Sequence, residues 1–156
     1  MVDTGDLRTT LEAYGTGLEA ELSLLRQLHR LALQARPVGR FDYDLLVRIS
    51  DERRRLMTSL LTIEDQIRPL RETIAAHLAD AARLPGFGDV SALHKVASHL
   101  VTLILGTDEE TVRALREADV ARRAAAQILE QAEATLAAYR RVVAPPSRPA
   151  LVSRCG

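Results

Sequence analysis

The chain has 156 residues, of which 21 are basic and 21 acidic, so its formal net charge is zero. This length suffices for one domain that buries a core without disulfides or a structural metal. The balanced charge gives no reason to expect nucleic acid or an anionic membrane as a partner. Aromatic residues make up only 3% of the chain, which is rich in Leu, Ala, Arg and Glu, and this bias predicts an all-α fold of long helices.

A first helix is predicted from about Asp6, which can cap the first turn. Gly15 and Gly17 weaken this helix, so we expect its end to fray, or else a neighbouring backbone to approach closely. Pro37 and Gly39 end it, and the short turn that follows sends the next helix back antiparallel. The residues expected to face inward recur at helical spacing: Leu7, Leu11, Tyr14, Leu18, Leu22, Leu25 and Leu28.

The second helix, starting at Asp42 or Asp44, has a heptad seam that predicts lengthwise contact with other helices. Arg53 interrupts the seam, and we expect it to reach past the apolar residues to an acid on a neighbouring helix. Pro69 is expected to kink the helix without ending it. The seam consists of Leu46, Ile49, Arg53, Leu56, Leu60, Ile63, Ile67, Leu70, Ile74 and His77.

After a predicted loop at 84–88, a helix starts at Asp89 or Ser91 and stops at Gly106. Thr107 and Glu110 have the spacing of a capping box, which would open a new helix. Either a tight turn or a kink within one long arm is compatible with this pattern, and the kink is the preferred interpretation.

The last helix, predicted over about 108–141, alternates Leu with Ala at its heptad positions. The overall prediction is an elongated antiparallel helical bundle or coiled coil of three long helices, the third broken near Gly106 in one of the two interpretations. Residues 1–143 are expected to form a single helical bundle domain, and 144–156 a flexible Pro/Arg-rich tail in which Cys155 is an unreactive thiol. The heptad seam of the last helix consists of Leu115, Ala118, Arg122, Ala125, Leu129, Ala132, Leu136, Tyr139 and Val143.

No motif of catalysis, cofactor binding or metal binding is recognisable, so we expect no enzyme, no catalytic residues, no cofactor and no metal. His94 and His99 are five residues apart, an awkward spacing for two ligands on one helix. The N-terminus lacks a basic and then apolar leader, and no uninterrupted apolar run approaches membrane-spanning length. A cytoplasmic location without membrane insertion is therefore expected.

The segment 46–64, LVRISDERRRLMTSLLTIE, resembles the corresponding part of the FlgN family of flagellar export chaperones. In that family a long first helix and a short turn precede a second helix with an aliphatic and acidic start, a basic residue and a Leu-rich end. The third long helix here ends near Tyr139, which agrees with the same plan. The matching positions in order are Ile49, Asp51, Glu52, Arg53, Leu56, Met57, Leu60, Ile63 and Glu64.

The resemblance implies a cytoplasmic chaperone that holds hook-associated (hook-filament junction) proteins before flagellar type III secretion, by binding their C-terminal helical segment. The export apparatus is left open as a second partner, and both a monomer and a homodimer are compatible with this function. An amphipathic cargo helix could fill a groove lined by the Ala-rich third helix. The residues expected to bind it are Leu115, Leu129, Leu136 and Tyr139.

Two other functions remain open. A structural or scaffolding coiled coil would self-associate through the same seams without cargo, and Arg53 and Arg122 favour it because polar seam residues often fix register and oligomer number. A helical regulator with a small ligand between its helices has no polar cluster to support it.

Overall fold

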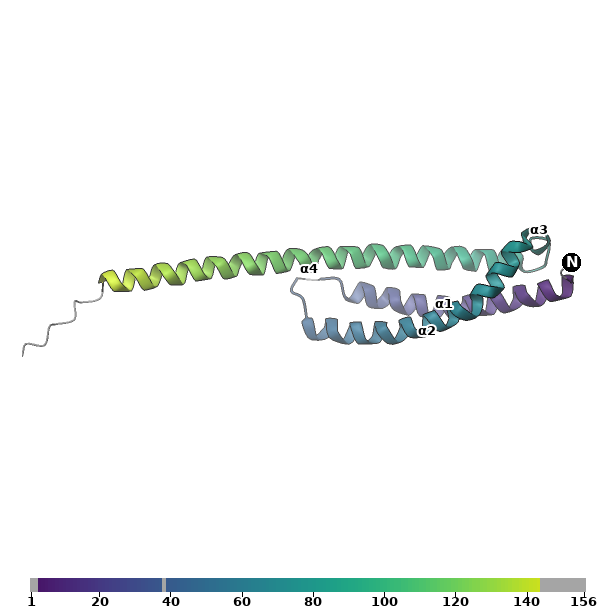
Figure 1. Cartoon of the computed structure of the whole chain (residues 1–156), viewed down its shortest axis with the longest axis horizontal. Helices are drawn as coiled ribbons and strands as arrows, with labels where there is room; N and C mark the ends of the chain where they lie inside the picture. The colour runs from purple at the N-terminus through teal and green to yellow at the C-terminus, as the bar shows by residue number, and fades with distance from the viewer. Residues whose placement is uncertain (1–2, 38, 144–156) are drawn as a thin grey trace, which may run out of the picture. The chain divides into compact units, whose positions relative to one another are not determined.

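The computed structural model of the chain describes residues 3–37 and 39–143, and these residues form helices joined by short connections (Figure 1). No strand occurs among them, so the all-α prediction is confirmed. The predicted flexible tail at 144–156, with Cys155, lies outside the described residues. The helices are α1 (Thr4–Gln34), α2 (Tyr43–Ala76), α3 (Leu78–Ala81) and α4 (Phe87–Val143).

Internal contacts group the chain into two units. Unit 1 is Met1–Ala114, with α1, α2, α3 and the first half of α4, and unit 2 is Leu115–Gly156, with the second half of α4. The expected single domain at 1–143 remains a prediction.

Helix α1 begins at Thr4, slightly earlier than predicted, because Asp3 and not Asp6 caps it: its carboxylate accepts from the Gly5 amide at 3.2 Å. Every α1 residue that the heptad spacing placed inward is buried, and Ala32 extends the same stripe. The inward face of α1 was therefore predicted correctly along its length.

The two glycines of α1 lie inside an unbroken helix, so the expected fraying is not found. Each leaves room for a side chain of a neighbouring helix rather than for its backbone. A Cβ added at Gly17 would lie 2.1 Å from Ile67 Cγ2 of α2, and one at Gly15 would lie 3.1 Å from Val90 Cγ2 of α4. Close approach of side chains, and not of the neighbouring backbone expected as the alternative to fraying, explains both glycines.

Helix α2 is capped by Asp42, whose carboxylate accepts from the Leu45 amide at 3.0 Å, and it ends at His77 as its C-cap. Pro69 lies within this one helix and does not end it, as expected. Figure 1 shows α2 as a continuous ribbon that curves over its second half. Its seam faces inward throughout, since all ten residues are buried or half-buried.

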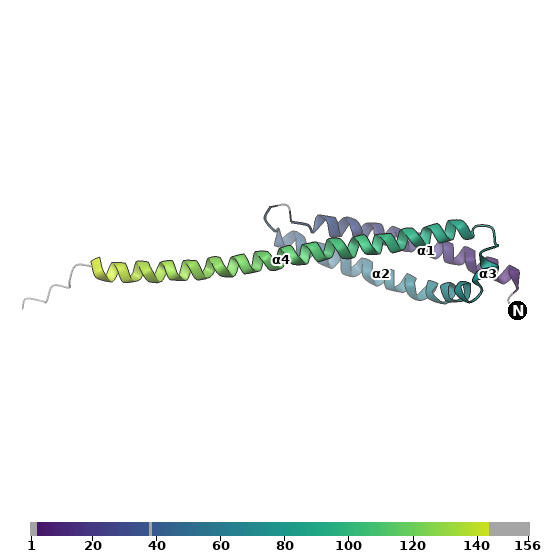
Figure 2. The same ribbon diagram turned by 90° about the horizontal axis from the view of Figure 1, so that it is seen from above.

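Two apolar clusters form the core of unit 1. One joins α1 residues from Leu7 to Leu18 with the second half of α2 and with Ala81 of α3, and the other joins α1 residues from Leu22 to Leu28 with Leu56 and with Ala97 and Ile104 of α4. Helices α1 and α2 accordingly lie side by side in both views (Figures 1 and 2). Burial of this stripe supplies the main driving force for unit 1.

Helix α4 starts just after Gly86, whose φ of +87° makes the turn that a residue with a side chain would resist. It then continues through Gly106 without a break, so the predicted capping box is wrong. The Thr107 hydroxyl donates to the Leu103 carbonyl at 2.8 Å, an interior helical bond, and Thr107 is itself buried. The inward face at Ile104, Thr107 and Thr111 keeps the helix on course past the glycine.

Candidate protein-binding surfaces

Arg53 forms a bidentate ion pair between two helices of unit 1. Its two terminal nitrogens donate to the two carboxylate oxygens of Asp108 on α4, both at 2.6 Å. The pair is half-buried, and the hydrogen bonds to Asp108 raise the pKa of the Arg53 guanidinium further above its ordinary range. The prediction that Arg53 reaches past the seam to an acid on a neighbouring helix is confirmed, and the bidentate geometry sets the position of α4 against α2.

A groove of about 440 Å³ opens beside this ion pair. Its floor is apolar, with contributions from α1, α2 and α4, and the polar groups stand at one end. Such a combination of an apolar channel with a few fixed polar groups suits an amphipathic helix or another elongated apolar guest. The lining residues are Leu25, Leu28, Ser50, Arg53, Arg54, Met57, Leu60, Val101, Ile104, Leu105 and Asp108.

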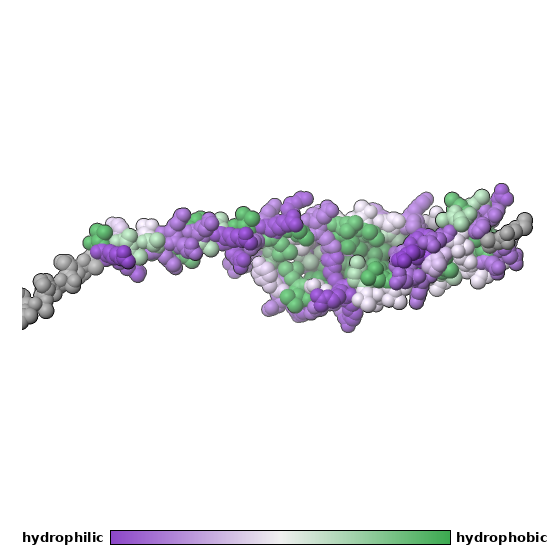
Figure 3. Space-filling model, viewed as in Figure 1, coloured by the Kyte–Doolittle hydropathy of each residue, from purple (hydrophilic) through white to green (hydrophobic). Residues whose placement is uncertain are grey.

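The groove is bordered by exposed apolar side chains on both helices. Met57 on α2 is 48% exposed and Leu105 on α4 is 58% exposed, and both line the groove. Figure 3 shows hydrophobic surface gathered over this α2–α4 side of unit 1. Contiguous apolar surface of this kind marks interaction sites in folded proteins.

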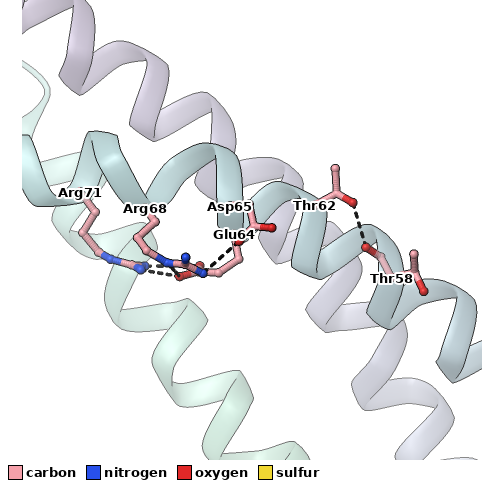
Figure 4. A network of polar contacts seen from close by, with 6 residues as sticks. All are labelled: Thr58, Thr62, Glu64, Asp65, Arg68 and Arg71. Atoms are coloured by element: carbon pink, nitrogen blue, oxygen red, sulfur yellow. Dashed lines mark hydrogen bonds and ion pairs between the residues drawn. The ribbon is translucent and has the colours of Figure 1, made fainter.

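A polar network occupies the second half of α2, away from the groove (Figure 4). Arg71 forms an ion pair with Glu64 across two helical turns, and Arg68 donates to Asp65 at 3.0 Å. Glu21 of α1 lies near Glu64 and Arg71, and its Oε2 is buried without a hydrogen-bond partner among the described residues. Burial raises the pKa of the Glu21 carboxyl above its ordinary value, Glu64 raises it further, and Arg71 opposes both.

A second, smaller pocket of about 190 Å³ lies at the other end of unit 1. The Tyr14 hydroxyl oxygen lies 3.2 Å from His94 Nδ1 at this pocket, within hydrogen-bonding distance. Burial raises the pKa of Tyr14, so the neutral phenol is the favoured form. His94 is thus a surface residue with a structural partner, and His99 is exposed on the same helix.

The predicted partner-binding residues all lie on α4 in unit 2. Leu115 is half-buried, whereas Leu129 is 59%, Leu136 56% and Tyr139 70% exposed. Their heptad spacing puts them on one stripe of the helix. The structure therefore leaves three of the four as exposed apolar side chains that nothing among the described residues covers.

The groove of unit 1 was not predicted from sequence. Its apolar border comes from residues next to the seam, such as Met57 beside Leu56 and Leu105 beside Ile104, which widen the apolar arc of each helix. That wider apolar arc was the sequence signal for the groove, but it indicates equally well a buried contact with a second helix. Only the assembled helices distinguish these two outcomes.

Two further findings concern metal binding and membrane insertion by the described residues. No group of three or more His, Cys, Asp or Glu side chains gathers there as a metal site. Within α4, Phe87–Val142 is long and apolar enough to cross a membrane by length and composition alone, a criterion that a buried core helix also meets. The absence of membrane insertion stays a prediction.

Comparison with known proteins identifies no relative. No family model, no curated protein and no solved structure matches this chain.

Proposed function

We propose that this protein is a cytoplasmic export chaperone of the FlgN type, which binds the C-terminal helical segment of a hook-associated protein before flagellar type III secretion. The proposal takes α1, α2 and α4 to act as the elongated antiparallel bundle that the sequence indicates. Its support from sequence is the resemblance over 46–64. The observation that carries it is the exposed apolar stripe Leu129, Leu136 and Tyr139 on α4.

An exposed stripe of this kind fits a helical partner. Side chains at steps of three and four on one helix meet the anchors of a second helix at i, i+3, i+4 and i+7. Small residues between the large ones, here Ala125 and Ala132, let the partner helix approach closely. A chaperone of this design recognises an amphipathic pattern and leaves the cargo to fold elsewhere after release.

The first test is calorimetry of the protein with synthetic C-terminal helical segments of hook-associated proteins from the same genome. A one-to-one complex is expected. Leu129→Asp should weaken it by about tenfold or more, because a carboxylate at an apolar anchor loses buried area and is desolvated. Leu136→Asp should act in the same direction.

Val120→Asp is the matched control. Val120 is also exposed, at 65%, but nine residues from Leu129 and so on the opposite face of α4. This variant should bind cargo as the unchanged protein does. Equal losses of cargo affinity in Leu129→Asp and Val120→Asp would contradict binding through the stripe. A loss of affinity confined to Met57→Asp would place the cargo in the groove of unit 1. If no segment binds the folded protein, the chaperone proposal fails and the self-associating scaffold replaces it.

A further inference from the structure

Large and small residues alternate along the seam of unit 2 from Leu115 to Leu136. In heptad letters, the a positions hold Leu115, Leu129 and Leu136, with Arg122 among them, and the d positions hold Ala118, Ala125, Ala132 and Tyr139. Residues from Val120 to Val142 are exposed without interruption. From Arg122 to Tyr139 the seam thus carries the pattern of a buried coiled-coil face while its side chains remain uncovered among the described residues.

This alternation makes the seam a poor partner for a parallel copy of itself. In a parallel pair each residue faces its own counterpart, so three layers would contain only alanines and would leave unfilled space. A fourth layer would bring Arg122 against Arg122 of the second copy, two like charges in the core of the coil.

An antiparallel pair centred on Gln127 removes both problems. It sets a positions opposite d positions, so that Leu129 faces Ala125 of the second copy and Leu136 faces Ala118. Leu115 then faces Tyr139, and Arg122 faces the small Ala132. Three of these four pairings combine one large with one small side chain, which lets the two helices approach closely, and the fourth, Leu115 with Tyr139, lies at the end of the paired stretch.

The charges agree with this arrangement. Glu133 follows Ala132, so in the antiparallel pair it flanks the layer that contains Arg122 of the other copy, and the symmetry creates this contact twice. Unit 1 already contains the same kind of contact, since Arg53 on the α2 seam pairs with Asp108 on α4. Among the described residues of one chain, Arg122 pairs with the half-buried Asp119 of its own helix, at 3.1 Å.

We propose that two copies of this protein form an antiparallel dimer through residues 115–139 of α4, with Arg122 of each copy paired to Glu133 of the other. With Gln127 at the centre, the paired stretch is 115–139, which is 25 residues or about 37 Å of helix. This inference goes beyond the proposed function and does not rest on it. Because both use Leu129 and Leu136, a second copy and a cargo helix compete for one surface, so self-association holds the stripe covered until cargo arrives.

Charge exchange tests the pairing directly. Arg122→Glu and Glu133→Arg should each weaken the dimer by about tenfold or more in sedimentation equilibrium. The double variant should restore the dissociation constant to within about threefold. Residues 122 and 133 lie about 16 Å apart along one helix, so they cannot contact within a chain and the rescue reports a contact between copies.

Arg123→Glu is the control, since Arg123 pairs with the same Asp119 at 3.0 Å but lies off the seam. It should leave the dimer unchanged while circular dichroism confirms equal helicity in all variants. A monomer at every attainable concentration would overturn the proposal, as would equal weakening by Arg123→Glu or a double variant that shows no rescue. None of these outcomes bears on cargo binding, which calorimetry measures separately.

Orientation has its own readout. A spin label on Ala138→Cys, with the single native cysteine changed by Cys155→Ser, should lie about 33 Å along the axis from its counterpart in the antiparallel dimer. A parallel dimer would place the two labels at the same height. A short label distance would therefore overturn the antiparallel arrangement even if the dimer itself forms.

Discussion

At Gly17 one absent methyl group decides how closely α1 and α2 approach. The Ile67 side chain that occupies the space is β-branched and 2% exposed, so it has few alternative rotamers and no free volume to move into. Gly106, by contrast, has nothing within 4 Å of an added Cβ and lies inside α4. The two helical glycines should therefore respond to alanine in opposite directions.

Gly17→Ala should destabilise the protein by about 1–3 kcal/mol, because overpacking against Ile67 outweighs a helix-propensity gain of about 1 kcal/mol. Gly106→Ala should stabilise it by up to about 1 kcal/mol, since the propensity gain is unopposed. Urea unfolding followed by circular dichroism measures both. A stabilising Gly17→Ala would mean that α1 and α2 lie farther apart than in this structure.

The stability of unit 1 depends on pH through the carboxyl group of Glu21. Its raised pKa means that the folded chain holds the carboxyl proton more tightly than the unfolded chain, so the free energy of unfolding falls as pH rises through the window just above 4.5. Glu21→Gln removes the charge and should raise the free energy of unfolding at neutral pH. The advantage should disappear below the ordinary pKa of 4.5, where the wild-type carboxyl is neutral in both states.

Urea titrations of Glu21→Gln at neutral and acidic pH measure this difference. Glu19→Gln, the same change at an exposed carboxylate on the same helix, is the control and should not raise the free energy of unfolding at neutral pH. An unaltered pH dependence in Glu21→Gln would show that the burial of this carboxyl is relieved in solution.

Single residues also show what a sequence can and cannot predict. Arg53 was recognised as a residue that must find an acid, because a charge on an apolar seam demands a partner. Asp108 was not identified as that partner, since two residues on different helices become neighbours only through the assembled structure. The prediction that the glycines of α1 fray the helix was wrong for the same reason, because fraying and close approach have the same local pattern in the sequence.

At the scale of the element, periodicity predicted which face of each helix turns inward more reliably than where each helix ends. The stripe of α1 and the seam of α2 were both correct, because a repeat of 3.5 residues is averaged over many positions. The turn or kink expected at Gly106 depended on one glycine and one capping pattern, and the buried Thr107 and Thr111 on the inward face of α4 outweighed both.

The predicted binding residues form a stripe on one helix, α4. Leu115, Leu129, Leu136 and Tyr139 were assigned to one face of a helix, and the structure shows the last three exposed on it. Sequence identified the stripe but not its exposure, because a heptad pattern is the same whether its partner is inside the chain, in a second copy or in a cargo protein. The exposure is what turns the pattern into a binding hypothesis.

At the scale of the whole molecule, both core clusters draw on residues no later than Ile104, and no described residue of unit 2 belongs to them. A chain that ends at Ala114 should therefore keep the thermal stability of unit 1. Differential scanning calorimetry at low protein concentration tests this, and loss of a cooperative transition in the shortened chain would show that unit 2 supports the core.

The same comparison separates a dimer from a monomer. A dimer formed through 115–139 stabilises the folded state by mass action, so the Tm of the full chain should rise with protein concentration. The chain that ends at Ala114 lacks the pairing helix, and its Tm should stay constant over the same range. Arg122→Glu should fall between the two, because it weakens the pairing without removing the apolar layers. Parallel concentration dependence in the full and shortened chains would place self-association in unit 1, where the groove beside Arg53 offers an apolar surface.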